Sequence, residues 1–327
     1  MKTIALVTGG FTGESVISFK SADFVSKNID REKYLVYQVV ISREGWYYAD
    51  ANNNKIAVDK NDFSIPLVEG KLRFDGVFIM LHGSPGEDGK LQSYFEMLDI
   101  PYVGCDALTS ALTMNKAYTK AVVANVPALY IARSVQLLSE SAGNIEKINT
   151  ALKLPLFVKT NTGGSSIGMS KVKTPEELPE ALKRAFAEDT QVIVEEFITG
   201  REFTVGIYSG KNGIIVLPAT EVISSKEFFD FEAKYTPGVT EEITPARMTA
   251  EQRKRVEAIV TEVYQKLNCK GMVRIDYFLE NETGNFYFVE INTIPGQTQT
   301  SFIPQQVAAA GINIQDFYTE LLDLAFE

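Results

Sequence analysis

The chain of 327 residues contains only two cysteines, one histidine and one tryptophan, and it has no long run of apolar residues. Cys105 and Cys269 lack the spacing of a metal site or a disulfide framework, so we expect buried thiols in a reducing compartment. A membrane-spanning helix needs about 20 apolar residues. The apolar segment Ile4–Val7 is too short for such a helix and for a secretory signal. These absences predict a cytoplasmic protein without a membrane partner.

An excess of positive charge is also missing. The sequence has 32 basic and 42 acidic residues, which gives a formal net charge of −10. Such a chain is a poor partner for nucleic acid, although a small anion can still bind where the local charge is positive. Hydrophobic residues make up 45% of the chain and charged residues 23%, as in ordinary globular proteins. The length allows two or three domains.

The most informative pattern is a hairpin near the C-terminus. Two apolar runs, Met272–Leu279 and Phe286–Ile291, flank the Asn- and Gly-containing segment Glu280–Asn285. We expect Asp276 to pair across from Glu290, because a slip of one residue would turn acids toward the core. This register places on one face Arg274, Asp276, Glu290 and Asn292, and on the other face Val273, Ile275, Val289 and Ile291.

The polar face of this hairpin is a candidate metal site. Asp276 and Glu290 supply carboxylates, and Asn292 supplies an amide oxygen. Hard oxygen ligands suit Mg²⁺, or Mn²⁺ in its place, together with water and phosphate oxygens. Calcium fits less well because no D-x-D-x-D-G loop is present. The alternative is a solvated face that carries one pair between Arg274 and Asp276.

Two glycine-rich loops indicate phosphate chemistry. The first, Gly9–Ser15, joins a strand to a helix and so offers backbone amides to an anion, but it does not fit the dinucleotide pattern G-x-G-x-x-G. The second, Thr160–Ser166, follows a strand that ends in Lys159. It is not a P-loop, because Met169 stands where the P-loop lysine is required. A plain Gly/Ser turn is the alternative for the second loop.

The only histidine, His82, follows the apolar strand Gly76–Leu81. A single histidine is often structural. However, ligands of parallel α/β sheets bind at the carboxyl ends of the strands, which favours a role for His82 at a site.

Several motifs occur in the same order in one known family. They are G-G-x-T-x-E at Gly9–Glu14, L-H-G-x-x-G-E-D-G at Leu81–Gly89, M-N-K at Met114–Lys116, K-x-x-x-x-G-S-S-x-G-x-S-K-V at Lys159–Val172, V-E-x-x-x-x-G-x-E at Val194–Glu202, F-x-D-x-E-A-K-Y at Phe228–Tyr235 and R-x-D…E-x-N-T-x-P-G-x-T-x-x-S at Arg274–Ser301. Together they resemble the D-alanine–D-alanine ligases, which have the ATP-grasp fold. The resemblance covers nearly the whole chain.

The resemblance implies an α/β fold of three domains. Residues 1–106 would form an N-terminal substrate-binding domain with a parallel, Rossmann-like sheet. Residues 107–190 would form the central ATP-grasp lid, and residues 191–327 a C-terminal mixed-sheet domain that carries the metal hairpin and an ω-loop.

The implied activity is ATP-dependent ligation of two D-alanines to D-alanyl-D-alanine for peptidoglycan synthesis. An acyl phosphate would be the intermediate, and ADP and phosphate would be released. Three alternatives stay open: another ATP-grasp carboxylate–amine ligase, a D-alanine–D-lactate ligase, and a nucleotide-binding module without turnover. The resemblance also leaves a homodimer open.

The resemblance further implies roles for individual residues. Those at the reaction centre are Glu14, Ser165, Tyr235, Arg274 and Gly296. Those that bind the amino-acid substrates are Glu14, His82, Ser301 and Phe302. Those that bind ATP are Lys116, Lys159, Ser166, Glu195, Glu196, Phe197, Ile198, Glu202 and Lys234. The metal ligands are Asp276, Glu290 and Asn292. This chain departs from the commonest family pattern at Ser15, Phe231, Gln297 and Phe302.

Overall fold

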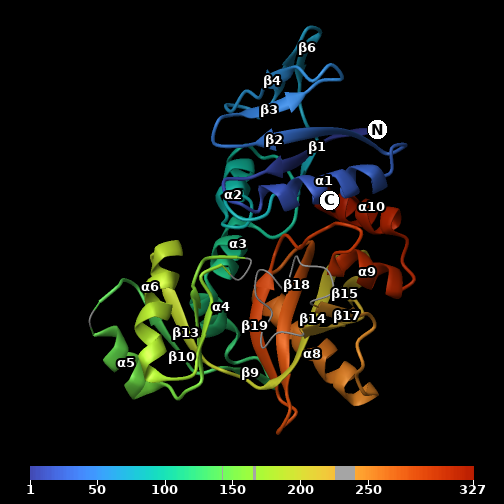
Figure 1. The fold of residues 1–327 in the computed structure, drawn as a ribbon. Helices are drawn as coiled ribbons and strands as arrows, with labels where there is room; N and C mark the ends of the chain where they lie inside the picture. The colour runs from blue at the N-terminus through green and yellow to red at the C-terminus, as the bar shows by residue number, and fades with distance from the viewer. Residues whose placement is uncertain (142, 165–166, 225–239) are drawn as a thin grey trace.

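A computed structural model describes residues 1–141, 143–164, 167–224 and 240–327. Within these ranges the strands form a six-stranded, a four-stranded and a seven-stranded sheet, together with a small two-stranded hairpin. Figure 1 shows the six-stranded sheet at the top and the other two below it. No helix in the described ranges is long and apolar enough to cross a membrane.

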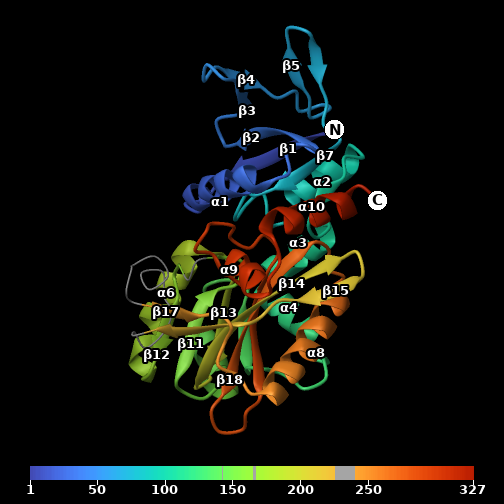
Figure 2. The same cartoon turned by 90° about the vertical axis from the view of Figure 1, so that its right-hand side faces the viewer.

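The six-stranded sheet has a parallel centre, as the N-terminal pattern predicts. Its order is β4-β3-β2-β1-β7-β8, with parallel pairing from β2 through β8 and an antiparallel edge hairpin. The bounds are β1 Lys2–Gly9, β2 Tyr34–Ile41, β3 Trp46–Ala49, β4 Lys55–Ala57, β7 Gly76–Ile79, β8 Tyr102–Val103, α1 Ser15–Asn28 and α2 Lys90–Met97. The hairpin β5 Ile65–Leu67 and β6 Gly70–Leu72 projects from this end of the molecule (Figure 2).

The last helix of the chain returns to this first sheet. Helices α9 (Phe302–Ala309) and α10 (Ile314–Ala325) follow the C-terminal hairpin. Phe317 and Leu322 of α10 share one hydrophobic core with Ile4 of β1 and Phe78 of β7. In Figure 1 the helix lies beside α1, close to the N-terminus. The core of the N-terminal region is therefore built from both ends of the sequence.

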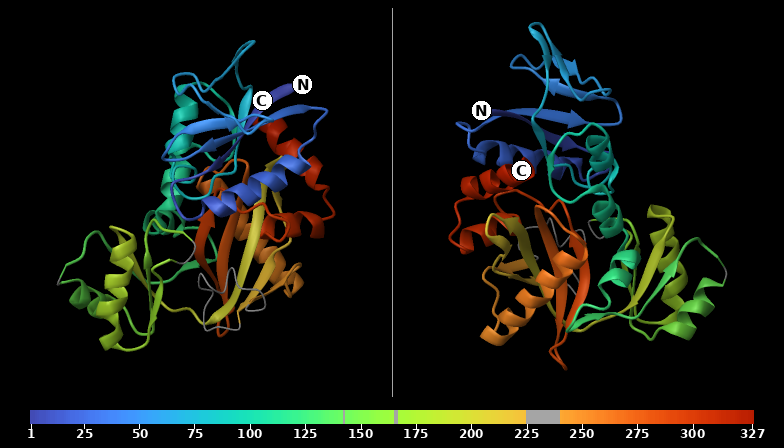
Figure 3. Two further views of the ribbon diagram at one scale, coloured as in Figure 1. Left: turned by 45° about the horizontal axis from the view of Figure 1, so that its top comes forward. Right: turned by 180° about the vertical axis from the view of Figure 1, so that it is seen from behind.

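The four-stranded sheet, which we call the lid sheet, has the order β10-β13-β11-β12. Its elements are β10 Ser134–Leu137, β11 Leu156–Thr160, β12 Ser170–Val172, β13 Val192–Glu196, α5 Asn144–Ala151, η1 Pro175–Glu177 and α6 Leu178–Glu188. Strands β11 and β12 are antiparallel, as expected for strands that flank the second glycine loop. Thr174 and Glu177 form a capping box, which the sequence pattern T-x-x-E at these positions predicts. Figure 3 shows this unit to one side of the seven-stranded sheet.

The seven-stranded sheet, which we call the large sheet, has the order β17-β16-β14-β18-β19-β9, with β15 paired to β14. Its strands are β9 Leu129–Ile131, β14 Gly200–Gly210, β15 Gly213–Val216, β16 Thr220–Ser224, β17 Thr240–Ile243, β18 Met272–Glu280 and β19 Phe286–Asn292. The helices α3 Ala107–Met114, α4 Lys116–Val123 and α8 Ala250–Lys266 complete this part of the fold. The sequence pattern Thr249–Gln252 predicts a helix start, and Thr249 does cap α8. Val256, Ile259 and Val263 are buried in the core that this helix shares with the sheet.

One prediction for this region is wrong. The sequence pattern predicts an irregular loop over the whole of residues 222–245, but β16 and β17 occupy both ends of that range and pair with each other. The segment 225–239 between them lies outside the described residues.

The functional end of the C-terminal hairpin has the predicted register. Asp276 lies opposite Glu290, and Arg274 lies opposite Asn292. The pairing therefore brings both carboxylates and the amide to one surface of the large sheet. Val273, Ile275 and Ile291 are buried on the other surface, as predicted.

A β-bulge interrupts the same hairpin one residue further on. Tyr277 pairs with Phe288 rather than with Val289, which leaves Val289 as an extra residue. The bulge disturbs the alternation of sides, so Phe288 pairs with the core residue Tyr277 and is buried, although it also borders the cavity that Glu290 lines. The expected core position of Val289 is thus wrong, because this residue is only partly buried and borders a cavity.

Candidate active site

One cavity of about 940 Å³ lies where the three sheets meet. Every predicted site residue that the structure describes lines it: Glu14, His82, Lys116, Lys159, Glu195, Glu196, Phe197, Ile198, Glu202, Arg274, Asp276, Glu290, Asn292, Gly296, Ser301 and Phe302. The predicted residues Ser165, Ser166, Lys234 and Tyr235 lie outside the described ranges. The cavity is therefore bordered by the N-terminal loops as well as by the lid sheet and the large sheet.

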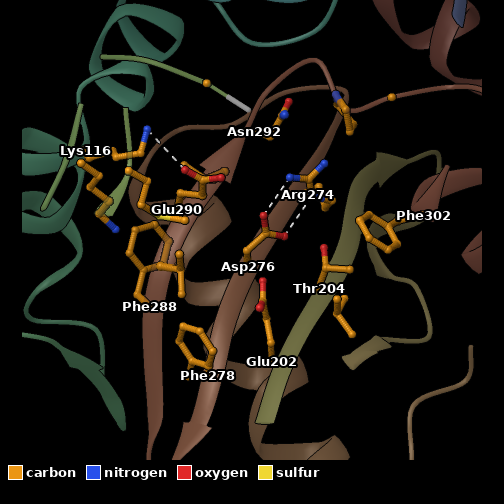
Figure 4. Close-up of a pocket in the computed structure, with 18 of the residues that line it drawn as sticks. Lys116, Glu202, Thr204, Arg274, Asp276, Phe278, Phe288, Glu290, Asn292 and Phe302 are labelled. Carbon is orange, nitrogen blue, oxygen red and sulfur yellow. Dashed lines mark hydrogen bonds and ion pairs between the residues drawn. The ribbon is translucent and has the colours of Figure 1, made fainter. Parts of the chain in front are cut away.

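The large sheet forms the floor of this cavity in ordered rows. The register of β14, β18 and β19 aligns Thr204 with Asp276 and Asp276 with Glu290. In the next row Arg274 lies opposite Asn292. Figure 4 shows these side chains on adjacent strands, with Thr204 beside Asp276. Antiparallel pairing thus gathers polar groups that are far apart in the sequence.

The acids of the floor are held by two cations. The guanidinium of Arg274 donates to both oxygens of Asp276, over 2.9 Å from Nε and 2.8 Å from Nη2. Lys116 Nζ lies 3.4 Å from Glu290 Oε2 (Figure 4). Burial alone would lower the pKa of Arg274, but Asp276 and Glu290 outweigh it and raise that pKa. Arg274 is therefore a permanent cation at the centre of the floor.

The chemistry of the predicted metal ligands fits a hard divalent cation. Asp276 and Glu290 supply carboxylate oxygens, and Asn292 Oδ1, which accepts the N–H of Ile294 over 3.0 Å, supplies an amide oxygen. In the described ranges no group of three or more His, Cys, Asp or Glu side chains is placed to hold a metal. A set of two acids and one amide would need water or phosphate oxygens to complete the coordination of the metal.

The lid side of the cavity has a different balance of charge. Glu195 of β13 lies between two lysines, with Lys159 Nζ 2.5 Å from Oε2 and Lys120 Nζ bonded to Oε1. Burial would raise the pKa of Glu195, but the two lysines lower it. Burial and the neighbouring lysines lower the pKa of Lys120. Two cations around one anion leave an excess positive charge on this wall.

Lys120 is a further residue of this site, and its role does not show in the sequence. It lies on α4 one turn after Lys116, so both ammonium groups can face the same side. That spacing was visible in the sequence, but a lysine on a helix is usually exposed, and Lys120 is only 3% exposed. Only the tertiary contact with Glu195 distinguishes it.

The N-terminal loops bring Glu14 to the cavity. Gly83 has a φ of +70°, and a Cβ at that position would lie 2.7 Å from Glu14 Oε2. A Cβ at Gly164 of the second glycine loop would lie 2.9 Å from Glu14 Oε1. Both glycines therefore allow close approach to the Glu14 carboxylate. Glu14 thus lies at the junction between the first loop, the His82 loop and the lid.

A second acid, Glu87, is close to this junction. Gly83 N–H donates to Glu87 Oε2 over 2.6 Å. Burial, and then the charge of Glu14, raise the pKa of Glu87 to about 8. In the sequence, Glu87 stands out only as part of the motif Leu81–Gly89. Its unusual protonation depends on surroundings that come from distant parts of the chain.

His82 is buried and uses both ring nitrogens within the protein. Its Nδ1 lies 2.9 Å from the carbonyl oxygen of Ile294, and its Nε2 lies 2.9 Å from Ser21 Oγ. A carbonyl can only accept, so Nδ1 carries the proton and Nε2 accepts from the serine hydroxyl. Burial lowers the pKa of this imidazole. His82 therefore lines the cavity as a neutral group that ties α1 to the loop after β19.

The loop after β19 leads to the N-terminus of α9. Ser301 is the N-cap of this helix, and its Oγ accepts the N–H of Thr298 over 2.9 Å. The ring of Phe302 lies 5.6 Å from the Arg274 guanidinium. A helix N-terminus beside a cation is suited to bind a carboxylate. Gln297 does not border the cavity. It is fully buried and accepts from Tyr318 OH over 2.8 Å.

At the opposite end, the segment after β13 is arranged around an aromatic pair. Phe197 lies 5.3 Å from Phe157, and Lys171 Nζ lies 3.6 Å from the Phe197 ring. The N–H groups of Glu196 and Phe197 already donate to Arg133 and Pro155. A base bound here would therefore depend on other backbone groups of this segment, such as those of Ile198.

The comparisons with known proteins agree with this architecture. Residues 3–105 match the family described as D-ala D-ala ligase N-terminus, and residues 119–323 match D-ala D-ala ligase C-terminus. The D-alanine–D-alanine ligase of Azobacteroides pseudotrichonymphae is 42% identical, over 99% of each chain.

Solved structures are similar over the same length. The VanG D-Ala:D-Ser ligase from Enterococcus faecalis has a TM-score of 0.88 at 33% identity, with 99% of each chain covered. D-alanyl-alanine synthetase A from Vibrio cholerae has a TM-score of 0.90 at 27% identity, with 99% of this chain and 98% of the other covered.

The fold and the charged cavity define an ATP-grasp ligase, which uses ATP and a divalent metal ion. The predicted fold class is therefore confirmed. The two family matches span most of the chain, and the full-length relatives agree with them. The chain belongs to the D-alanine–D-alanine ligase family.

Proposed function

We propose that this protein joins two D-alanines to D-alanyl-D-alanine in the cytoplasm, for peptidoglycan synthesis. ATP would be converted to ADP and phosphate, with Mg²⁺ as the metal and Mn²⁺ as its substitute. The single observation that carries the proposal is the shared cavity. It combines a lysine-rich wall, a floor that carries two acids and the N-terminus of α9, and apart from Lys120 these charged groups are residues that the family resemblance identifies.

The charges of the cavity support separate roles for its two sides. Lys116 and Lys159 would neutralise nucleotide phosphates, while Glu196, Phe197, Ile198 and Glu202 would bind the nucleoside. Asp276, Glu290 and Asn292 would hold the metal ion, which supplies charge neutralisation during phosphoryl transfer.

The chemistry of ligation assigns the remaining groups. A carboxylate is a poor acyl donor until it is phosphorylated. Glu14 would hold the ammonium of the first D-alanine, and His82 would keep that end of the cavity in place. Arg274 and the N–H of Gly296 would stabilise the oxyanion as the second amine attacks. Ser301 and the N–H of Phe302 would bind the second carboxylate.

A second candidate is ligation of D-alanine to D-serine. The similarity to the VanG D-Ala:D-Ser ligase favours it, because that enzyme is also covered over its whole length. Phe302 and Arg274 border the expected second-substrate position here, so the side chain of the second substrate would be selected by this part of the cavity.

One experiment separates these activities. Purified protein would be incubated with ATP, Mg²⁺ and equal concentrations of D-alanine, D-serine and D-lactate, and the products would be separated by mass. We expect D-alanyl-D-alanine to predominate near pH 7. A mixed product with D-serine or D-lactate as the main species would overturn the assigned second substrate. Absence of both product and phosphate release would favour a module without turnover.

A further inference from the structure

The hydroxyl of Thr204, on the floor of the cavity, is a buried and unsatisfied polar group. Its Oγ1 is buried and has no hydrogen-bond partner among the described residues, and the residue is 2% exposed. The other side chains in this condition belong to Thr8, Gln92, Ser170 and Tyr277, and none of these lines the cavity. A buried hydroxyl without a partner is destabilising, so its presence at this position requires a reason.

The backbone around Thr204 is held firmly in place. Gln306 Nε2 donates to the carbonyl oxygen of Thr204 over 3.1 Å, and Gln306 Oε1 accepts the N–H of Gly206 over 2.7 Å. Strand β14 also pairs along its length with β18. The backbone position of Thr204 is therefore set by the fold, and its hydroxyl can gain a partner only when a neighbouring side chain moves toward it.

Asp276 is the residue directly opposite Thr204 across the β14–β18 pair. Side chains at directly opposite positions have Cβ atoms about 5 Å apart, within reach of a hydroxyl-to-carboxylate hydrogen bond. In the present structure both oxygens of Asp276 accept from Arg274 instead. The two bonds leave acceptor sites free on the carboxylate, but in the orientation that Arg274 imposes it accepts nothing from the Thr204 hydroxyl.

We propose that Thr204 is a positioning residue for Asp276 in the metal-bound enzyme. This inference rests on the proposed function, in which Asp276 turns its carboxylate to the metal ion and its pair with Arg274 opens. Asp276 then loses two hydrogen bonds, and the Thr204 hydroxyl replaces one of them. The new bond fixes the orientation of the carboxylate, as hydrogen bonds to metal-ligating carboxylates commonly do.

Strand propensity does not account for a threonine here. Valine has the same shape and is equally suited to a β-strand, and it would leave no buried hydroxyl unpaired. Thr204→Val should therefore affect the free and the metal-bound protein in opposite directions. Thr204→Ser retains the hydroxyl and tests whether that group is responsible.

The experiment compares the purified wild type with Thr204→Val, Thr204→Ser and the control Thr8→Val. Thr8 is also buried with an unpaired hydroxyl among the described residues, but it lies in β1 and does not line the cavity. Thermal denaturation without ligands gives the stability of each variant. Calorimetric titration with ADP, with and without Mg²⁺, gives nucleotide affinity independently of turnover.

We expect Thr204→Val to denature at the wild-type temperature or roughly 2 °C above it. Its Mg²⁺-dependent gain in ADP affinity should fall about ten-fold. Thr204→Ser should recover most of that gain, and Thr8→Val should retain all of it. ADP affinity without Mg²⁺ should be the same in all four proteins.

Two outcomes would overturn the inference. One is that Thr204→Val shows the same Mg²⁺-dependent gain in ADP affinity as the wild type. The other is a loss in Thr204→Val that Thr204→Ser does not restore. A different result, in which Mg²⁺ has no effect on ADP binding by the wild type, would instead contradict the metal site of the proposed function.

Discussion

The lid wall and the floor of the cavity differ in the balance of their charged side chains. On the lid wall two lysines surround Glu195, so the excess charge is positive. On the floor Arg274 and Lys116 face Asp276 and Glu290, and the acids remain within reach of a ligand. A nucleotide with its metal ion has both signs of charge. The two surfaces are therefore complementary to different parts of one ligand. Substitutions on the floor should lower turnover, whereas substitutions on the lid wall should lower stability.

The largest expected effect is on the floor. Asp276→Asn and Glu290→Gln should each lower kcat by roughly 10³-fold, because a metal ion contributes several kcal/mol to phosphoryl transfer. The fold should persist, since neither side chain belongs to a hydrophobic core. Steady-state kinetics over a range of Mg²⁺ concentrations measures the effect.

Glu280→Gln is a matched control for this test. Glu280 lies on the same strand, β18, but outside the cavity. It should retain normal turnover. Near-normal activity of both floor variants at saturating Mg²⁺ would contradict the assignment of Asp276 and Glu290 as metal ligands. It would also contradict the proposed difference between the floor and the lid wall.

The lid wall predicts an intermediate effect on stability. Glu195→Gln leaves two buried lysines without their anion and should cost about 3 kcal/mol. Lys120→Met leaves the pair between Glu195 and Lys159 intact and should cost less than about 1 kcal/mol. Chemical denaturation of the ligand-free variants tests this order. Equal losses would show that the excess positive charge does not determine the stability of the cluster.

The smallest effect concerns Glu87, the buried acid at the N-terminal side of the cavity. Its folded-state pKa of about 8 lies above the ordinary value of 4.5, so the native protein binds this proton more tightly than the unfolded chain. Stability should therefore decrease as the pH rises from about 4.5 to 8. Glu87→Gln removes this loss and should raise the denaturation midpoint by roughly 5 °C at pH 8, relative to wild type.

The measurement for Glu87 is thermal denaturation at pH 5 and pH 8. The two proteins should be similar at pH 5 and differ at pH 8. An identical pH dependence would mean that Glu87 is charged in the folded protein.

Sequence reasoning succeeded where local chemistry determined the structure. The alternation of sides predicted the pairing of Asp276 with Glu290, and Thr249 correctly marked the start of α8. The bulge at Val289 was not predictable, because one extra residue reverses the pattern on which the prediction depends.

Long-range contacts were the other obstacle. In the sequence Lys120 is an ordinary helical lysine, and only the contact between α4 and β13 shows that it binds Glu195. Similarly, only the tertiary structure shows that the Thr204 hydroxyl is buried without a partner among the described residues. Likewise, nothing in the local pattern of α10 shows that it packs against the first sheet. Each of these properties depends on segments that are distant in the sequence.

The docking of α10 on the N-terminal sheet has a consequence for synthesis. Residues 1–106 emerge from the ribosome first, but Phe317, Tyr318 and Leu322, which complete their core, are translated after residues 107–313. At about 5–20 residues per second, the first sheet waits roughly 10–40 s for the helix that covers it. During that interval the nascent chain exposes apolar surface that the finished protein buries. The N-terminal region is therefore first in the sequence and among the last parts of the molecule to reach its native packing.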